Sequence, residues 1–168
     1  MVLSNNETIG QTAEYAICKV FNLKSEINDN RIDINLSNKL QPLLKQFCDI
    51  NKLKVTKNLG YLNGVVDFNL DNNKTLSLKT LKKEQGKICP QKIGQPTLKS
   101  WDKIFKKDFD GDIKKNNERF DYIKDNIHEY LNKMLLNIYC CDYLLVISNV
   151  YNEPKLEILP KITDYFDN

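Results

Sequence analysis

The sequence predicts a mixed α/β domain, of the α+β type, in which helices flank both faces of a central mixed sheet. Two amphipathic helical patterns come first, over about residues 5–21 and 36–47, and two short strand-like runs follow, over 65–70 and 75–80. A continuous apolar run at residues 143–147 is typical of a strand that is buried on both faces of a parallel or mixed sheet. Helices and strands of these kinds pack as layers around one core.

The composition indicates a globular protein of a reducing compartment. The 168 residues suffice for a single domain, 1–168, that buries about two-thirds of the surface of its unfolded chain. The N-terminus lacks the basic start and apolar run of a signal peptide, and no apolar run approaches the ~20 residues that span a bilayer. We therefore expect a cytoplasmic, intracellular protein without membrane contact.

Cysteine and histidine usage excludes several classes of site. Five cysteines at irregular spacing, without a CxxC pair, predict buried free thiols and neither a disulfide framework nor a zinc site. His128 is the single histidine and lies in a charged helical pattern, which argues against a Ser-His-Asp or Cys-His enzyme.

The first helical pattern opens with a capping box, because Ser4 and Glu7 have the spacing with which a hydroxyl and a carboxylate satisfy amides at a helix start. Apolar residues then recur at helical spacing as far as Val20. Gly10 costs about 1 kcal/mol relative to alanine, so we interpret it as a position of close approach to another element. Glu14, one turn later, would lie in the seam between this helix and the sheet; a solvated helix flank is the alternative.

The second helical pattern is core scaffold. We expect Pro42 close to its first turn, where a missing amide is least harmful. The polar residues 24–35 ahead of it read as a loop. A strand over residues 52–58 follows, and Gly60 and Gly64 indicate a tight turn or bulge after it.

The two strand-like runs predict a hairpin about residues 71–73, because Asn and Asp favour turns. Side chains alternate between the faces of a strand, so the leucines of the second run face a core and Lys79 shares the opposite face with Ser77. The hairpin brings Asp67 onto the face of Lys79. A carboxylate beside an ammonium group can hold a divalent metal and help to organise an attacking water. The alternative is a solvated ion pair, worth under about 1 kcal/mol.

The stretch from residue 64 to residue 80 resembles the core of the PD-(D/E)xK nuclease superfamily, and especially its type II restriction endonucleases. In that pattern an Asp is followed, after a hairpin, by an acidic or polar residue, any residue and Lys. Here the pattern reads Asp67 and then Ser77-Leu78-Lys79. Val66 replaces the name-giving Pro, and Ser77 replaces the second acid. The resemblance covers about a tenth of the chain.

This resemblance implies a restriction-endonuclease-like fold and Mg²⁺-dependent hydrolysis of double-stranded DNA, leaving a 5′-phosphate and a 3′-hydroxyl. It makes Asp67 and Glu14 the carboxylate ligands of the metal, because many members place a Glu of their first helix there. By the same resemblance, the Leu78 carbonyl would be a further ligand. Lys79 would orient or activate the attacking water, and Ser77 would hold a metal-bound water.

Other interpretations of the site stay open. Glu7, two turns before Glu14, and Glu84 are alternative sources of the second acid. Structure-selective resolvases and repair nucleases use the same core, and Ser77 in place of an acid favours a non-catalytic nucleic-acid-binding module. A palindromic recognition site calls for a two-fold homodimer, although a small enzyme can also act as a monomer.

Positive charge is concentrated between residues 74 and 115, where twelve lysines accompany five acids, whereas the whole chain has a formal net charge of +3. A basic surface beside a metal site fits a phosphate backbone, and solvated Lys-rich loops are the alternative. Glutamine can bond adenine, and lysine can contact guanine or phosphate. The candidates for DNA contact in the basic loop region, about 80–115, are Lys82, Lys83, Gln91, Lys92 and Gln95.

The remaining elements complete the predicted fold. A helix over about 97–105 carries Trp101, which we expect in the core. The acidic run at 108–112 lacks the Glu that an EF-hand needs at its twelfth position, so we interpret it as a turn. Apolar residues at helical spacing predict one long helix over 118–137, and a last strand is expected over 155–159.

Overall fold

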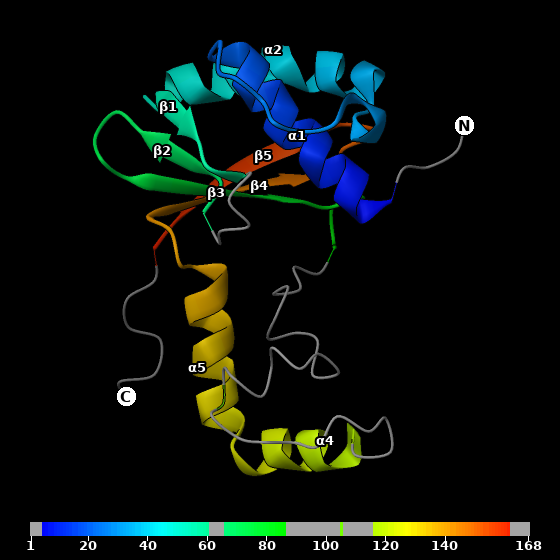
Figure 1. Ribbon diagram of the computed structural model, residues 1–168, viewed down its shortest axis with the longest axis vertical. Coiled ribbons are helices and arrows are strands. Elements are labelled where there is room, and N and C mark those ends of the chain that lie inside the picture. The colour runs from blue at the N-terminus through cyan, green and yellow to red at the C-terminus, as the bar shows by residue number, and fades with distance from the viewer. Residues whose placement is uncertain (1–4, 61–65, 87–104, 106–115, 162–168) are drawn as a thin grey trace. The chain divides into compact units, whose positions relative to one another are not determined.

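The structure, a computed structural model, describes residues 5–60, 66–86, 105 and 116–161 (Figure 1). Its elements, in chain order, are α1 (Asn6–Val20), a 3₁₀ turn (Asp29–Arg31), α2 (Ile34–Ile50), β1 (Val55–Asn58), β2 (Phe68–Leu70), β3 (Thr75–Thr80), α4 (Asn116–Asp125), α5 (Ile127–Ile138), β4 (Tyr143–Ser148) and β5 (Lys155–Pro160). The chain forms two compact units, the first from residues 1–88 and 141–161 and the second from the remainder. That both belong to one nuclease-like domain stays a prediction.

The first unit is built on a five-stranded mixed sheet with the strand order β1-β2-β3-β4-β5. β3 and β4 are parallel, and every other neighbouring pair is antiparallel. β4 is buried on both faces, because Leu144 and Leu145 point to opposite sides and are both 0% exposed. The predicted mixed α+β class, the buried strand and the last strand are confirmed.

Helices α1 and α2 cover one face of this sheet (Figure 1), and α1 lies directly against β3. Ala13 and Ala16 of α1 are fully buried, and their small side chains let the helix approach the sheet closely. Leu76 and Leu78 of β3 face the same core, as predicted. Burying a leucine or isoleucine side chain contributes roughly 1.5–3 kcal/mol, so this layer stabilises the hairpin that carries Asp67.

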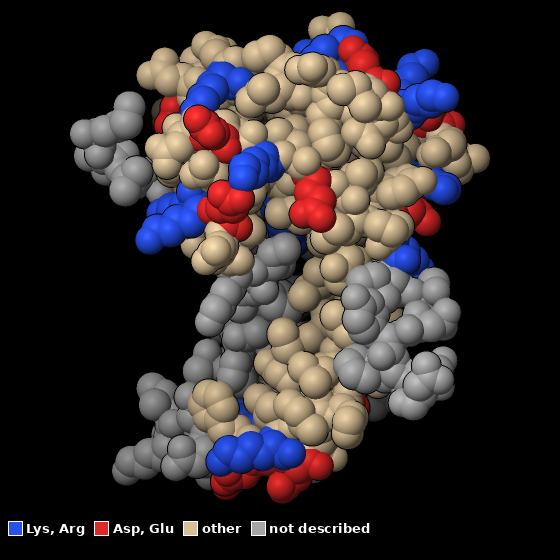
Figure 2. Space-filling view, turned by 180° about the vertical axis from the view of Figure 1, so that it is seen from behind, with Lys and Arg blue, Asp and Glu red and all other residues tan. Residues whose placement is uncertain are grey.

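The surface of the molecule carries charges of both signs. Figure 2 shows Lys and Arg interspersed with Asp and Glu on one face, without a continuous patch of one sign among the residues coloured there. Of the segment from 74 to 115 in which lysines predominate, residues 87–104 and 106–115 lie outside the described residues. Cys18, Cys48 and Cys141 are buried and form no disulfide, as expected, whereas Cys140 is only half-buried and Cys89 lies outside the described residues. In the part of the chain described, no helix is long and apolar enough to cross a membrane.

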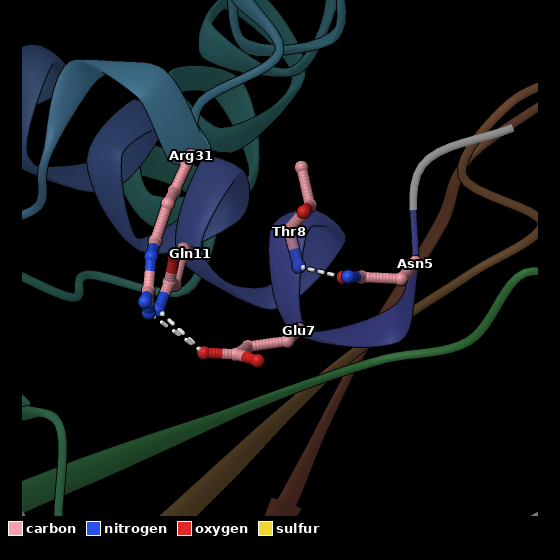
Figure 3. Close-up of polar contacts among 5 residues, drawn as sticks. All are labelled: Asn5, Glu7, Thr8, Gln11 and Arg31. Carbon is pink, nitrogen blue, oxygen red and sulfur yellow. Dashed lines mark hydrogen bonds and ion pairs between the residues drawn. The ribbon is translucent and has the colours of Figure 1, made fainter. Parts of the chain in front are cut away.

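The start of α1 corrects the predicted capping box. The N-cap is Asn5, whose side chain accepts a hydrogen bond from the backbone N–H of Thr8 at 2.7 Å (Figure 3). Asn caps a helix as well as Ser does. The predicted partner Glu7 is instead engaged with Arg31 and Gln11. Ser4 lies outside the described residues.

Two further expectations on the helices are wrong. Pro42 lies inside α2, more than two turns from its start, because the helix begins at Ile34 behind the N-cap Asp33. Gly10 does not mark a close approach, since a Cβ there would lie 3.9 Å from Oγ1 of Thr80, an ordinary van der Waals distance.

The second unit contains α4 and α5, which replace the single long helix expected over 118–137. The helix is interrupted at Asn126, because the φ of −126° and ψ of 40° at this residue are not helical. Phe105 is buried in this unit, with its ring 5.8 Å from that of Tyr122 and 5.9 Å from that of Tyr130. Trp101 and the acidic run at 108–112 lie outside the described residues.

Candidate active site

The β2–β3 hairpin places Asp67 beside the middle of β3. The turn at residues 71–73 forms as predicted: Asn73 adopts a left-handed φ of 60°, and the side chain of Asn72 accepts from the N–H of Lys74 at 3.2 Å. The backbone N–H of Asp67 donates to the Leu76 carbonyl at 3.2 Å. Asp67 therefore sits where the β2–β3 ladder ends, with its position set by backbone hydrogen bonds.

The Asp67 carboxylate is held against the backbone of β3. Its Oδ2 accepts a hydrogen bond from the N–H of Leu78 at 2.7 Å. Burial raises the pKa of Asp67, while this hydrogen bond and the Lys79 ammonium act in the opposite direction. Asp67 is half-buried, and its carboxylate is oriented by this hydrogen bond.

Glu14 of α1 joins this group from above the sheet. Its pKa is raised from the ordinary 4.5 to about 7, because burial disfavours the charge and the Asp67 carboxylate repels it, while Lys79 partly opposes both effects. The structure therefore brings Glu14, Asp67 and Lys79 within electrostatic range of one another. None of the ion pairs among the described residues joins Lys79 to either carboxylate.

Ser77 and Leu78 complete the stretch of β3 at the site. Ser77 is 1% exposed, whereas Thr75 and Lys79 on the same face of the strand are half-buried. Backbone groups of Leu76 and Leu78 bond Asp67, so the even-numbered residues of β3 direct their backbone toward β2. The N–H and C=O of one strand residue point to the same side. The Leu78 carbonyl therefore faces the side on which Asp67 lies.

The two alternative acids lie elsewhere. Glu7 pairs with Nη1 of Arg31 at 3.0 Å, with the two side chains 66% and 61% exposed. Figure 3 shows Glu7, Gln11 and Arg31 pointing toward one another, around a contact on the surface. Glu84 pairs with Lys155, and both side chains are exposed. Among the three glutamates considered, Glu14 is the one that faces Asp67.

The candidates for DNA contact are only partly described. Lys82 and Lys83 lie two and three residues after the end of β3; Lys82 is half-buried and Lys83 is exposed. Gln91, Lys92 and Gln95 lie outside the described residues. The roles assigned to all of these side chains stay predictions.

Two residues beside the site were given no role in it from the sequence: Asn58 was the end of a predicted strand, and Gly60 was part of a predicted turn. Asn58, 7% exposed at the end of β1, donates from Nδ2 to Sγ of Cys18 at 3.3 Å and accepts from the N–H of Gly60 at 3.0 Å. A Cβ on Gly60 would lie 2.9 Å from Oε2 of Glu14. Asn is unfavourable in strands, so its place in a strand pattern was the available signal.

The donor atoms at the site are oxygens. Among the described residues no group of three or more His, Cys, Asp or Glu side chains gathers as a metal cluster, so the carboxylates of Glu14 and Asp67 are the acidic donors. Hard cations such as Mg²⁺ take oxygen ligands, and Mg²⁺ keeps several waters, so few protein ligands suffice. A divalent cation would also offset the repulsion that raises the pKa of Glu14. The residues present fit such an ion.

Comparison with known proteins relates the chain to a restriction enzyme. It is 33% identical over 143 residues to the type II restriction enzyme CviAII of Paramecium bursaria Chlorella virus 1, a match that covers 76% of this chain and 40% of that enzyme. The chain thus spans about 40% of the length of this curated relative. No family model matches the sequence, and no solved structure matches it significantly. Over most of its length the chain is similar to part of a type II restriction enzyme.

Proposed function

We propose that this chain is a Mg²⁺-dependent DNA endonuclease of the type II, site-specific kind, which hydrolyses phosphodiester bonds in double-stranded DNA. The observation that carries the proposal is the meeting of the half-buried residues Glu14, Asp67 and Lys79 at one site. Buried acids with raised pKa beside a cationic side chain are typical of functional sites. The similarity to part of a type II restriction enzyme supports the same activity.

In this proposal Asp67 and Glu14 hold the metal, with the Leu78 carbonyl as a further oxygen ligand. Bound Mg²⁺ supplies Lewis acidity toward the phosphate and lowers the pKa of a coordinated water. The 2.7 Å hydrogen bond from the N–H of Leu78 orients the Asp67 carboxylate. That contact leaves Oδ1, and one lone pair of Oδ2, for the ion.

Lys79, which follows Leu78 on β3, contributes positive charge to the site. Its ammonium orients or activates the attacking water and stabilises the negative charge that develops on the phosphorus oxygens. Ser77, two residues earlier on the same face, holds a water of the metal. The expected products are a 5′-phosphate and a 3′-hydroxyl.

The substrate follows from charge as well as from similarity. A segment with twelve lysines against five acids fits the polyanionic backbone of duplex DNA. Lys82 and Lys83 are the described candidates for phosphate contact. A palindromic site would be cut by a two-fold homodimer.

Two other functions are outcomes of the same test. A structure-selective resolvase or repair nuclease would use the same residues on branched DNA. A non-catalytic binding module is favoured by one observation, namely Ser77 in place of the second acid of the pattern. A pure binder would not need Mg²⁺, and Asp67→Ala would leave its affinity for DNA nearly intact.

The experiment is incubation of purified protein with a long duplex DNA and Mg²⁺, read on a gel. We expect discrete bands that disappear with EDTA or Lys79→Ala. Lys57→Ala is the matched control, because Lys57 is an exposed lysine on another strand of the same sheet, and it should cut normally. Intact duplex together with cut branched DNA would support the structure-selective nuclease. Intact DNA with a salt-sensitive mobility shift would overturn the catalytic proposal in favour of a binding module.

A further inference from the structure

Asn58 connects two parts of the chain that border the proposed metal site. It ends β1, is 7% exposed, and uses both ends of its amide: Nδ2 donates to Sγ of Cys18 at 3.3 Å, and Oδ1 accepts from the N–H of Gly60 at 3.0 Å. Cys18 lies four residues after Glu14, so it is on the same side of α1, one turn further along. Asn58 therefore holds the Gly60 backbone to the part of α1 that bears Glu14.

Gly60 leaves the space that the Glu14 carboxylate occupies. A Cβ added there would lie 2.9 Å from Oε2 and 3.8 Å from the carboxyl carbon of Glu14, and the first distance is shorter than real Cβ contacts allow. No described glycine has a positive φ, so the backbone at Gly60 does not itself demand glycine. Glycine matters at this position because it has no side chain to collide with the Glu14 carboxylate.

We propose that Asn58 and Gly60 are positioning residues for Glu14: Asn58 fixes the Gly60 backbone, and Gly60 forms the wall that sets where the Glu14 carboxylate lies relative to Asp67. Neither residue touches the metal or the DNA in this proposal. The inference rests on the proposed function, because it concerns the geometry of the same metal ligands. Residues that orient metal ligands typically contribute about 10–100-fold to metal affinity.

The test is direct binding of Mn²⁺, a spectroscopic substitute for Mg²⁺, to the DNA-free protein, measured by electron paramagnetic resonance. We expect Gly60→Ala to weaken Mn²⁺ binding by about 10-fold or more, because the new methyl group displaces the Glu14 carboxylate. Gly10→Ala is the matched control: the same substitution, on α1 itself, places its Cβ at an ordinary distance from Thr80 and should bind Mn²⁺ as the wild type does.

A double variant shows whether the effect passes through Glu14. In a Glu14→Ala background the clash partner is gone, so Gly60→Ala should weaken Mn²⁺ binding by less than about 2-fold further. A separate and equal loss in that background would overturn the positioning role. Thermal unfolding in EDTA accompanies each variant, and Gly60→Ala is expected to melt close to the wild type, because the displaced atom is the end of a flexible side chain.

Asn58→Ala tests the other half of the proposal. Removal of the amide frees Gly60, so we expect weaker Mn²⁺ binding, again by about 10-fold. Thr56→Ala is its control on the same strand, since Thr56 is exposed and its hydroxyl bonds the Asn69 carbonyl away from the site. If Asn58→Ala fails to fold, Gly60→Ala and its double variant still decide the question.

Failure of this inference is distinguishable from failure of the proposed function. If the wild type binds Mn²⁺, and Asp67→Ala and Glu14→Ala bind it measurably more weakly, but Gly60→Ala and Asn58→Ala bind it normally, the positioning proposal alone is overturned. If the wild type neither binds Mn²⁺ nor cuts DNA, the metal-dependent function itself is overturned, and the positioning proposal with it.

Discussion

Two glutamates of α1, Glu7 and Glu14, lie two turns apart on nearly the same side of the helix, yet their surroundings are opposite. Glu7 is in the first turn, 66% exposed, and pairs with Arg31, which is also exposed. Glu14 is in the middle of the helix, half-buried, with a pKa raised to about 7 beside Asp67. The same residue type on the same face therefore serves a surface contact in one place and a candidate metal site in the other.

The difference shows what makes a carboxylate available for chemistry. Glu7 has an exposed cation as partner and lies near the positive end of the helix dipole, which favours its charge. Glu14 is half-buried beside Gly60, and it faces a second carboxylate. A site in which two half-buried carboxylates repel each other is stabilised when a cation binds between them.

The largest expected effect is on catalysis. Glu14→Ala should lower cleavage of duplex DNA by on the order of 100-fold or more, because it removes a proposed metal ligand. Glu7→Ala, the matched change two turns away, should stay within about 2-fold of the wild type, since an exposed ion pair contributes little. Rates are measured on a linear duplex at several Mg²⁺ concentrations. Equal losses in the two variants would erase the distinction between the two glutamates.

The second effect concerns pH and stability. The folded-state pKa of Glu14 lies above its ordinary 4.5, at about 7, so its contribution to stability is fully present below pH 4.5 and is lost as pH rises through 7. Each pKa unit corresponds to about 1.4 kcal/mol, which makes the loss on the order of 3 kcal/mol. Glu14→Gln should therefore unfold at higher urea concentration than the wild type at pH 8, in EDTA.

The same comparison at pH 4 provides the control for this prediction. There the wild-type carboxyl is protonated, and the advantage of Glu14→Gln over the wild type should largely vanish. Urea curves of the two proteins that differ by the same amount at pH 4 and pH 8 would contradict the assignment of a buried, ionisable Glu14.

A smaller effect is expected at Thr12, which lies between the two glutamates. Its hydroxyl is fully buried, donates to the Thr8 carbonyl at 2.7 Å and accepts from the N–H of Asp33 at 3.0 Å. Thr12→Val keeps the shape but leaves that N–H without its partner, so we expect a loss of about 1–3 kcal/mol in urea unfolding. Cleavage at a temperature where the variant is folded should be unchanged. A neutral variant would mean that the N–H finds water instead.

The smallest effect is expected at the surface contact. Arg31→Ala removes the partner of Glu7 and should lower the free energy of unfolding by under about 1 kcal/mol, a difference that salt screens further. Urea unfolding at low and at high ionic strength measures it. A loss comparable with that of Thr12→Val would show that the Glu7–Arg31 contact supports the fold more than its exposure indicates.

Much of the fold was predictable from local pattern. The apolar spacing of α1, the alternation in β3 and the continuous apolar run of β4 each report which face is buried, because the period of a helix or strand relates spacing to direction. The Asn-rich turn fixed the hairpin register, and the hairpin in turn brought Asp67 onto the face of Lys79. Those relations are short-range, so the amino-acid order contains them.

Other features depended on contacts that no local pattern encodes. The N-cap is Asn5 and not the predicted Ser4, because either side chain can bond a first-turn amide. Glu7 bonds Arg31, which lies far along the chain, and does not complete a capping box. The helix over 118–137 divided at Asn126, although its apolar spacing continued across the break. Local propensity is a weak preference that tertiary packing readily overrides.

The α+β class, the hairpin and the placement of Asp67 on the same sheet face as Lys79 follow from the amino-acid order alone, since they depend on periodicity and turn chemistry. Only the tertiary structure selected Glu14 over Glu7 and Glu84, because that choice depends on which carboxylate the packed sheet buries beside Asp67. It also revealed Asn58 and Gly60. Their contacts with α1 join residues some 40 positions apart, and such proximity exists only once the helix lies on the sheet.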